Sequence, residues 1–206
     1  RNMLDEAGLE DCKIVVSNSL DEYTITSILQ QGGKIDSFGV GERLITAKSD
    51  PVFGAVYKIA AVEENGIFEP RIKVSENVEK ITNPGLKDVY RVYDETGHSI
   101  ADLIVRNGET VDMSKPYRYA DPVKPWKNRY FENCHAVKLQ QKVVEKGKRI
   151  VEKQSLDEIR DYVKQQLATE VWEEEQRFEN PHVHYIDMSP SYYAMKMEML
   201  HESRTK

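Results

Sequence analysis

The chain has 206 residues, of which 39% are hydrophobic and 31% are charged, and its formal net charge is −6 at pH 7. This composition is typical of a folded globular protein rather than a disordered one. The negative charge argues against binding of nucleic acid or of an anionic membrane by the chain as a whole, so a phosphate ligand needs a local site. No apolar run approaches the roughly 20 residues of a membrane-spanning helix. We therefore expect neither nucleic acid nor membrane partners.

The two cysteines, Cys12 and Cys134, lie far apart and lack the spacing of a disulfide framework or a metal site. This usage, together with the absence of a secretory signal pattern at the first residues, favours a cytoplasmic protein. The chain opens with Leu4 and Ala7 at helical spacing ahead of Gly8, a suitable helix C-cap. A start in the middle of a helix predicts that the chain is a fragment of a longer protein.

Residues 9–47 carry the pattern of a parallel β-α-β unit. An apolar run at 13–16 predicts a buried strand, and a helix follows from Asp21 to the glycines at 32–33. A second strand is predicted at 35–38. Because two parallel strands leave open edges and half-covered faces, we expect further strands upstream.

Residues 51–112 change to the pattern of antiparallel β-hairpins. Asn65-Gly66 is the dipeptide preferred in a tight type I′ turn. The predicted strands of these hairpins span 56–62, 71–74, 89–93 and 99–104.

Residues 113–206 predict a C-terminal hairpin and a helical tail. An irregular, proline-containing connector at 114–129 precedes a hairpin with strands at 137–144 and 149–151. The helical tail begins at Ser155, which forms a capping box with Glu158 ahead of an amphipathic helix. The apolar stripe of that helix consists of Leu156, Ile159, Val163, Leu167 and Val171.

The end of the chain predicts a short strand and a last helix. The strand lies at 182–186, and Pro190 begins the helix, with Asp187 or Ser189 as its cap. We interpret the aromatic and methionine side chains of this helix as packing in the core or at a subunit interface. These are Tyr192, Tyr193, Met195, Met197 and Met199.

The turn Gly39-Val40-Gly41-Glu42 is the strongest candidate binding site. It follows a predicted buried strand and begins a helix, and glycines in this position let backbone N–H groups approach a phosphate. A tight turn without a ligand is about equally consistent with the spacing. The carboxylate of Glu42 would have to point away from a phosphate.

Ser17-Asn18-Ser19 is the second candidate, since it also follows a strand. Ligands of parallel α/β sheets gather at the carboxyl ends of the strands, and short polar side chains there suit ribose hydroxyls. The simpler alternative is that these residues cap the next helix, with Ser19 accepting hydrogen bonds from its first N–H groups.

Two other residue pairs carry weaker signals. His182 and His184 share one face of the predicted strand, as metal ligands do, but no third ligand is near in sequence, and we predict no metal site. Cys134 beside His135 lacks a group that would orient a thiol nucleophile.

Five segments, taken in order along nearly the whole chain, resemble the nicotinate phosphoribosyltransferase family. These segments are Val16 to Glu22 (V-S-N-S-L-D-E), Ile35 to Gly41 (I-D-S-F-G-V-G), Pro51 to Lys58 (P-V-F-G-A-V-Y-K), Lys80 to Lys87 (K-I-T-N-P-G-L-K) and Asn180 to His182 (N-P-H). Each segment is short, but their common order makes the resemblance specific.

The resemblance implies an α/β plus β fold: the C-terminal part of a type II phosphoribosyltransferase α/β barrel, then an antiparallel β region and C-terminal helices. Residues 1–50 would be the last β-α units of the incomplete barrel. The family joins nicotinate to 5-phosphoribosyl-1-diphosphate with the help of ATP and Mg²⁺, and its members form homodimers. By this resemblance, the turn from Gly39 to Gly41 would hold the 5-phosphate and Ser17 to Ser19 would face the ribose or its phosphate. Lys80 and Lys87 would reach a diphosphate.

The chain departs from the family pattern in two ways. Glu42 stands where a small hydroxyl residue is frequent, and the family's phosphorylatable histidine and nicotinate-binding residues are expected upstream of Arg1. The catalytic residues are therefore not assigned, and we expect the 206 residues alone to be inactive. Two alternatives stay open: a nicotinamide or quinolinate phosphoribosyltransferase, and a non-catalytic fragment that supports an assembly.

Overall fold

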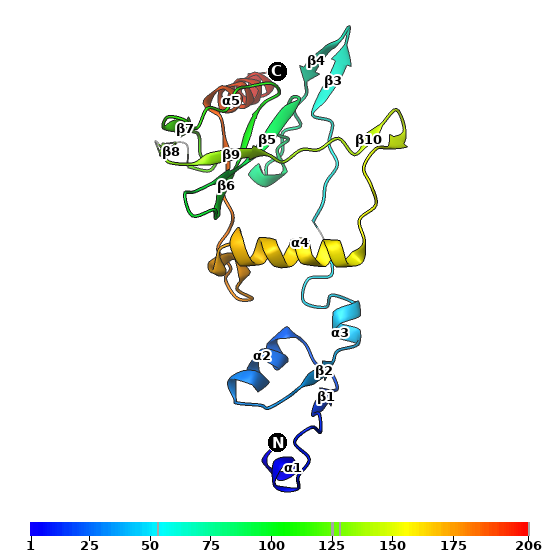
Figure 1. Cartoon of the computed structure of the whole chain (residues 1–206). Coiled ribbons are helices and arrows are strands. Elements are labelled where there is room, and N and C mark those ends of the chain that lie inside the picture. The colour runs from blue at the N-terminus through cyan, green and yellow to red at the C-terminus, as the bar shows by residue number, and fades with distance from the viewer. Residues whose placement is uncertain (53, 125, 128, 206) are drawn as a thin grey trace. The chain divides into compact units, whose positions relative to one another are not determined.

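The computed structural model describes residues 1–52, 54–124, 126–127 and 129–205. The chain forms two compact units, Arg1–Tyr57 and Lys58–Lys206 (Figure 1). We refer to them as the N-terminal unit and the C-terminal unit. Within the described ranges we find no helix with the length and hydropathy of a membrane span.

The N-terminal unit contains the predicted β-α-β unit. Its elements are α1 (Asn2–Glu6), β1 (Val15–Ser17), α2 (Glu22–Gln30), β2 (Ser37–Gly39) and α3 (Glu42–Ile45). Strands β1 and β2 pair in parallel, with Val16 opposite Phe38. The two strands, the helix between them and the parallel pairing are therefore confirmed. Each strand begins two residues later than predicted, and neither is buried in this chain, so the prediction of a buried strand is wrong.

Local sequence explains both ends of α2. Asp21 is its N-cap and accepts a hydrogen bond from the Thr24 N–H, which satisfies a free donor of the first turn. At the other end Gly32 has φ +84° and the Gly33 N–H bonds to the Ile28 carbonyl at 3.0 Å, the pattern of a Schellman C-cap. A Cβ on Gly33 would lie 2.8 Å from Ile28 Cγ2, so only glycine fits there.

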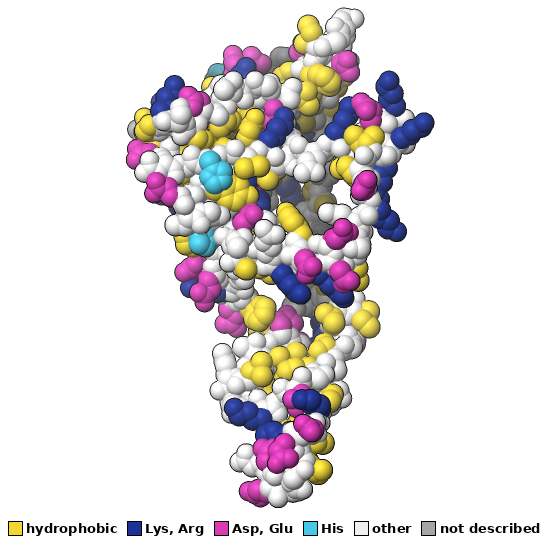
Figure 2. Space-filling view, viewed as in Figure 1, with side chains coloured by type: hydrophobic (Ala, Val, Ile, Leu, Met, Phe, Trp, Pro, Cys, Tyr) yellow, Lys and Arg dark blue, Asp and Glu magenta, His cyan; other side chains and the backbone are white. Residues whose placement is uncertain are grey.

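The N-terminal unit has almost no core of its own. Leu20 is the one buried side chain among its described residues. Val15 is 63% exposed and Leu44 is 69% exposed, and hydrophobic side chains are visible on the surface around α2 in Figure 2. Parallel sheets are normally covered on both faces. This two-stranded parallel sheet instead leaves hydrophobic side chains exposed within the chain.

The C-terminal unit is built on a four-stranded sheet with strand order β12-β6-β5-β9. Three short hairpins accompany the sheet: β3–β4, β7–β8 and β10–β11. The strands are β3 (Ala61–Glu64), β4 (Ile67–Pro70), β5 (Lys87–Tyr93), β6 (Ser99–Arg106), β7 (Tyr117–Tyr119), β8 (Arg129–Phe131), β9 (His135–Lys138), β10 (Val144–Glu145), β11 (Lys148–Arg149) and β12 (Ile186–Met188). The helices are α4 (Leu156–Thr169) and α5 (Pro190–Thr205), with 3₁₀ turns η1 (Val78–Lys80) and η2 (Glu173–Gln176).

The predicted hairpin turns are confirmed, but the strands beside the first are not where they were predicted. Asn65 and Gly66 have φ values of +53° and +81°, as a type I′ turn requires. The strands they join are β3 and β4, so the prediction at 56–62 is wrong in extent and the prediction at 71–74 is wrong in position, because β4 ends at Pro70. The second hairpin joins β5 to β6, as predicted.

Non-local pairing explains the other corrections. The predicted strand at 137–144 is wrong: β9 ends at Lys138 and pairs with β5, and only β10 and β11 form the local hairpin. The predicted connector at 114–129 contains β7 and the first residue of β8. The predicted strand at 182–186 lies later, as β12, where it pairs in parallel with β6.

The core lies on both faces of β6. On one face Leu103 and Val105 pack with Val92 of β5 and with the stacked rings of Tyr119 and Phe131 from the β7–β8 hairpin. On the other face Ile104 packs with Met188 and with Tyr192 of α5. Tyr193 and Met195 pack against this second cluster, so their predicted core role is confirmed. Met197 is exposed instead.

Both predicted C-terminal helices are present. The Ser155–Glu158 capping box of α4 is confirmed by both of its hydrogen bonds. Ser189 caps α5, because its hydroxyl accepts the Tyr192 N–H. From Leu156 to Leu167 the stripe of α4 faces solvent within this chain, with these side chains 44–61% exposed. The helix ends at Thr169, so the prediction that Val171 belongs to the stripe is wrong.

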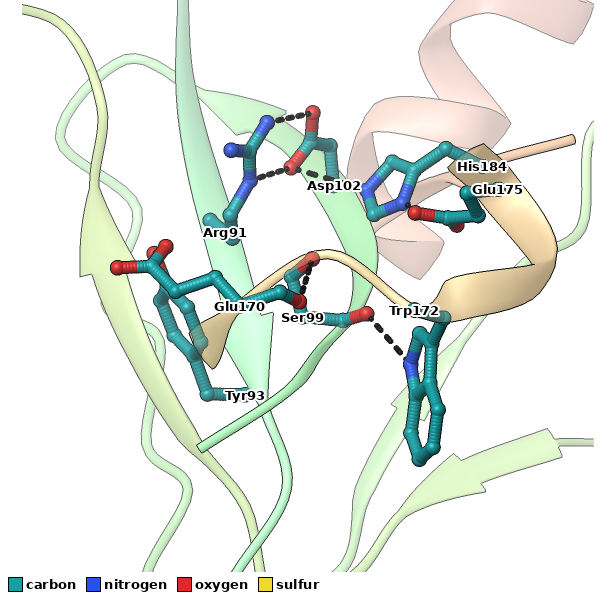
Figure 3. Close-up of polar contacts among 8 residues, drawn as sticks. All are labelled: Arg91, Tyr93, Ser99, Asp102, Glu170, Trp172, Glu175 and His184. Carbon is teal, nitrogen blue, oxygen red and sulfur yellow. Dashed lines mark hydrogen bonds and ion pairs between the residues drawn. The ribbon is translucent and has the colours of Figure 1, made fainter. Parts of the chain in front are cut away.

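A partly buried polar cluster joins the segment after α4 to the sheet (Figure 3). Arg91 makes two hydrogen bonds to Asp102, and His184 lies between two carboxylates, 3.1 Å from Glu175 and 3.5 Å from Asp102. Burial opposes ionisation of Asp102, but His184 and Arg91 outweigh it and lower its pKa to about 2. Asp102 and Glu175 in turn raise the pKa of His184.

Further hydrogen bonds strengthen the same junction between the sheet and the segment after α4. The Trp172 indole donates to the Ser99 carbonyl at 3.1 Å, and the Ser99 N–H donates to the Glu170 carbonyl at 2.9 Å. Tyr93 donates to the Glu170 carboxylate at 2.8 Å. Together these contacts hold the end of α4 and η2 against β5 and β6 (Figure 3).

Candidate functional site

The turns after β1 and β2 form a cavity of about 290 Å³ within the N-terminal unit. The carboxyl ends of parallel strands meet at one edge of a sheet, which brings the two turns together. The lining residues are Asn18, Ser19, Leu20, Gly39, Gly41, Glu42 and Arg43. The structure therefore joins most of the predicted phosphate and ribose residues, while Ser17 and Val40 lie outside the lining.

The backbone of the cavity has the features expected of a closely fitted loop. Ser17 pairs with Gly39, and a Cβ on Gly39 would lie 3.2 Å from Ser17 Cβ. Asn18 and Ser19 have φ values of +92° and +49°. Positive φ at non-glycine residues costs about 1–3 kcal/mol each and clusters at functional sites. A Cβ on Gly41 would meet no atom within 4 Å, so the cavity is open there.

The charges around the cavity are arranged in pairs. The Arg43 guanidinium forms an ion pair with the Asp21 carboxylate, whose pKa is lowered by hydrogen bonds from Thr24 and by this charge. Glu42 is exposed, and its carboxylate lies 3.9 Å from the Lys48 ammonium. Lys48 thus partly offsets the negative charge that Glu42 brings to the rim.

The helix-capping alternative for Ser19 is wrong. Asp21, not Ser19, accepts the hydrogen bonds of the first turn of α2. Ser19 instead contributes to the wall of the cavity. The polar residues after β1 are therefore available for a ligand rather than engaged as a helix cap.

Comparison with known proteins identifies the family. The sequence profile of the nicotinate phosphoribosyltransferase C-terminal domain matches residues 86–196, more than half of the chain. The chain belongs to the nicotinate phosphoribosyltransferase family.

Individual members of the nicotinate phosphoribosyltransferase family match the whole chain or most of it. The Bacillus subtilis nicotinate phosphoribosyltransferase is 39% identical, over 100% of this chain and 42% of its own length. The Dictyostelium discoideum protein of the same name is 33% identical, over 89% of this chain and 32% of its own length. The chain thus spans less than half of each relative.

A solved structure shares the fold. The crystal structure of human nicotinic acid phosphoribosyltransferase superimposes with a TM-score of 0.73 over 97% of this chain and 36% of that protein, at 22% sequence identity. The chain therefore shares a mixed α/β and β architecture with that structure.

The two lysines that were predicted to bind the diphosphate, Lys80 and Lys87, lie in the C-terminal unit. Lys87 is half-buried and donates to the Asn83 and Gly85 carbonyls at 2.9 and 3.1 Å. Burial lowers its pKa. Lys80 lies in the exposed turn η1 and its carbonyl accepts a hydrogen bond from Lys58. Lys87 therefore holds its loop in place, and diphosphate binding by Lys80 and Lys87 stays a prediction.

The predicted histidine pair is divided between two environments. His184 belongs to the partly buried cluster with Asp102 and Glu175, whereas His182 makes an edge contact with the Tyr185 ring. Among the described residues no group of three or more His, Cys, Asp or Glu side chains is placed to hold a metal ion. The Cys134 thiol donates to the Glu132 carbonyl, and burial raises its pKa.

Two lining residues were missed in the sequence, Leu20 and Arg43. Arg43 directly follows the Gly41-Glu42 turn, and a basic residue beside a predicted phosphate loop is a usable signal. Leu20 carries no chemical signal in the sequence. Its role follows only from its burial beneath the turn.

Proposed function

We propose that this protein is the part of a nicotinate phosphoribosyltransferase that holds the phosphoribosyl group. The whole enzyme would join nicotinate to 5-phosphoribosyl-1-diphosphate, giving nicotinate mononucleotide and diphosphate in NAD salvage. The observation that carries this proposal is the cavity formed by the turns after β1 and β2 in a chain of this family. The match to part of each relative agrees with an inactive isolated chain, whose activity needs residues of the longer enzyme.

The cavity suits a sugar phosphate in size and chemistry. Glycines at positions 39 and 41 leave the backbone accessible, and backbone N–H groups are good phosphate donors. Asn18 and Ser19 supply polar side chains for ribose hydroxyls. We assign the 5-phosphate to the turn from Gly39 to Gly41, with Arg43 as the nearby cation.

Positioning would supply most of the catalysis. The bond from the ribose to the leaving diphosphate breaks through an oxocarbenium-like transition state, so a firmly held 5-phosphate fixes the reacting carbon relative to nicotinate. The carboxylate of Glu42 stays compatible with this role as long as it remains directed to Lys48.

The proposal extends to the co-substrates and the assembly. Mg²⁺ would enter with the diphosphate substrate, and ATP hydrolysis would assist the reaction in the complete enzyme. We further propose a cytoplasmic homodimer in which the N-terminal unit completes an α/β barrel. The uncovered hydrophobic side chains of that unit, such as Val15 and Leu44, support this arrangement.

Nicotinate is the base that the comparisons favour. The relatives reported above are named for nicotinate or nicotinic acid, rather than for nicotinamide or quinolinate. A competition assay with the complete enzyme tests this choice. Nicotinate should compete for the base-binding site, and nicotinamide should not.

The test of the phosphate site is calorimetric titration of the chain with 5-phosphoribosyl-1-diphosphate and Mg²⁺. A Gly41→Asp variant adds a negative charge to the open wall of the cavity, and its side chain fits because no atom lies within 4 Å. We expect it to weaken binding about tenfold or more. Gly54→Asp is the matched control, since it adds the same charge to the same unit at another open position.

Binding that Gly41→Asp reduces and Gly54→Asp leaves unchanged supports the proposed site. Equal weakening by both variants would mean that only net charge matters. Binding that neither variant changes would place the phosphate elsewhere and overturn the assignment.

A further inference from the structure

A second cavity, of about 390 Å³, lies within the C-terminal unit at the side of the sheet where β12 approaches the β7–β8 hairpin. It shares no residue with the cavity of the N-terminal unit. Its volume is in the range of cavities that bind small molecules. Its lining residues include Tyr119, Arg129, Tyr185 and Asp187.

Asp187 is the unusual member of this wall. The residue is 3% exposed, and within the described part of the chain its carboxyl group has no hydrogen bond or ion pair. Burial, with the charge of nearby Asp121 added, raises its pKa to about 7, although Arg129 acts in the opposite sense. A largely buried carboxyl group without a protein partner is costly to ionise, because burial removes most of its water.

The other groups around Asp187 favour a positive ligand. The acidic residues Asp94 and Glu132 line the same cavity, and Arg129 is the one cationic residue among the described lining residues. The Asp94 carboxylate accepts hydrogen bonds from Thr96 and His98. The tyrosines Tyr119, Tyr130 and Tyr185 are also among the lining residues. Arg129 already lies 5.7 Å from the Tyr185 ring centre, a cation–π contact. The Cys134 thiol in the wall stays neutral at pH 7, because burial raises its pKa.

We propose that this cavity binds a small organic cation, an alkylammonium or alkylguanidinium group, with the Asp187 carboxylate as its counter-charge. Tyrosine faces bind such cations by the attraction of their π electrons. This proposal does not rest on the proposed phosphate site.

Binding is coupled to proton release. The empty site favours protonated Asp187, and an incoming cation favours the ionised form, so the carboxyl proton leaves to solvent as the ion pair forms. The affinity for the cation therefore rises with pH through the range in which free Asp187 titrates. Between pH 6 and pH 8 we expect it to increase roughly tenfold.

The experiment is calorimetric titration of the 206-residue chain with ethylguanidinium and ethylammonium at pH 6 and pH 8. Buffers of different ionisation enthalpy report the released proton. Asp187→Asn should weaken binding at least tenfold at pH 8, and it should not unfold the chain because it removes an unfavourable buried charge. Arg129→Gln removes the like charge and should tighten binding. Circular dichroism of both variants confirms that they are folded.

Several outcomes would overturn the proposal. One is no binding of either cation at millimolar concentration. Another is binding that Asp187→Asn leaves unchanged. A third is weaker binding in Arg129→Gln together with binding of propionate, which would make the cavity an anion site.

Discussion

The two units of this chain differ in where they keep their hydrophobic side chains. The C-terminal unit buries Leu103 and Val105 completely in a sheet covered on both faces. The N-terminal unit buries Leu20 alone among its described residues, and Leu44 is 69% exposed. Yet the cavity assigned to the phosphoribosyl group lies in the unit without a core. The buried core therefore lies in one unit and the proposed phosphoribosyl site in the other.

This separation has a physical reason. A binding turn needs exposed backbone and unusual φ values, both of which reduce local stability. Asn18 and Ser19 meet that description, and such strain persists only where surrounding structure holds it. The N-terminal unit holds these turns with parallel pairing and helix caps rather than with a core.

The largest expected effect comes from truncating the core. Leu103→Ala should destabilise the C-terminal unit by about 2–5 kcal/mol, because it leaves a cavity at a side chain with 0% exposure. Tryptophan fluorescence during urea unfolding measures this, since both tryptophans, Trp126 and Trp172, lie in that unit.

Leu44→Ala is the matched control for Leu103→Ala. It removes the same atoms from the exposed surface of the N-terminal unit, so the tryptophan transition should not move. Equal shifts in the two variants would contradict the contrast between the units.

The ion pair between Arg91 and Asp102 should give the next largest effect. Asp102→Asn leaves Arg91 without its counter-charge, and we expect a loss of about 1–3 kcal/mol at pH 7. The pKa of Asp102 is lowered to about 2, so its contribution is complete above the ordinary aspartate range and is lost as the pH falls toward 2. Urea unfolding at pH 7 and pH 3 tests both statements. Asp157→Asn, at an exposed pair on α4, should change neither transition.

His184 should make the stability of the C-terminal unit depend on pH. Its pKa is raised by Asp102 and Glu175, so protonated His184 stabilises the fold below the ordinary histidine pKa and this contribution is lost as the pH rises through the higher folded value. His184→Gln should remove about 0.5–1.5 kcal/mol at low pH and less at high pH.

The His184 measurement needs a background in which Asp187 does not titrate. Asp187 has a raised pKa, about 7, so its ionisation also lowers stability as the pH rises through that range. Thermal unfolding from pH 5 to pH 8.5 in an Asp187→Asn background separates the two groups. His135→Gln, on the exposed face of β9, is the control. An unchanged pH profile in His184→Gln would refute the role of the cluster.

The smallest effect concerns the start of α4. Ser155→Ala removes the capping box and should reduce stability by about 1 kcal/mol, or less if the first turn frays without unfolding the unit. Amide hydrogen exchange should accelerate in the first turn of α4 and not in β6. Gln154→Ala, one residue earlier and outside the box, should have no such effect.

Local signals in the sequence predicted much of this structure. The capping box at Ser155, the type I′ turn at Asn65-Gly66 and the β-α-β unit each depend on residues close together in the chain. The pairing of β9 with β5 and of β12 with β6 depends on contacts between distant segments, which a single sequence does not specify. The addition of β12 to the sheet also buries Asp187. Because this pairing joins distant segments, the cavity beside Asp187 could not be predicted from the sequence. The turns of the phosphate cavity were predicted because glycine and short polar residues follow two strands.

The central claim is that the turns after β1 and β2 bind the phosphoribosyl group. Amide NMR spectra of the chain, recorded during addition of 5-phosphoribosyl-1-diphosphate and Mg²⁺, test it most directly. We predict that the largest shifts fall on Asn18, Ser19, Gly39 and Gly41, while amides of the β12-β6-β5-β9 sheet other than Lys87 stay unchanged. Largest shifts in the C-terminal unit, with those four amides unmoved, would contradict the account.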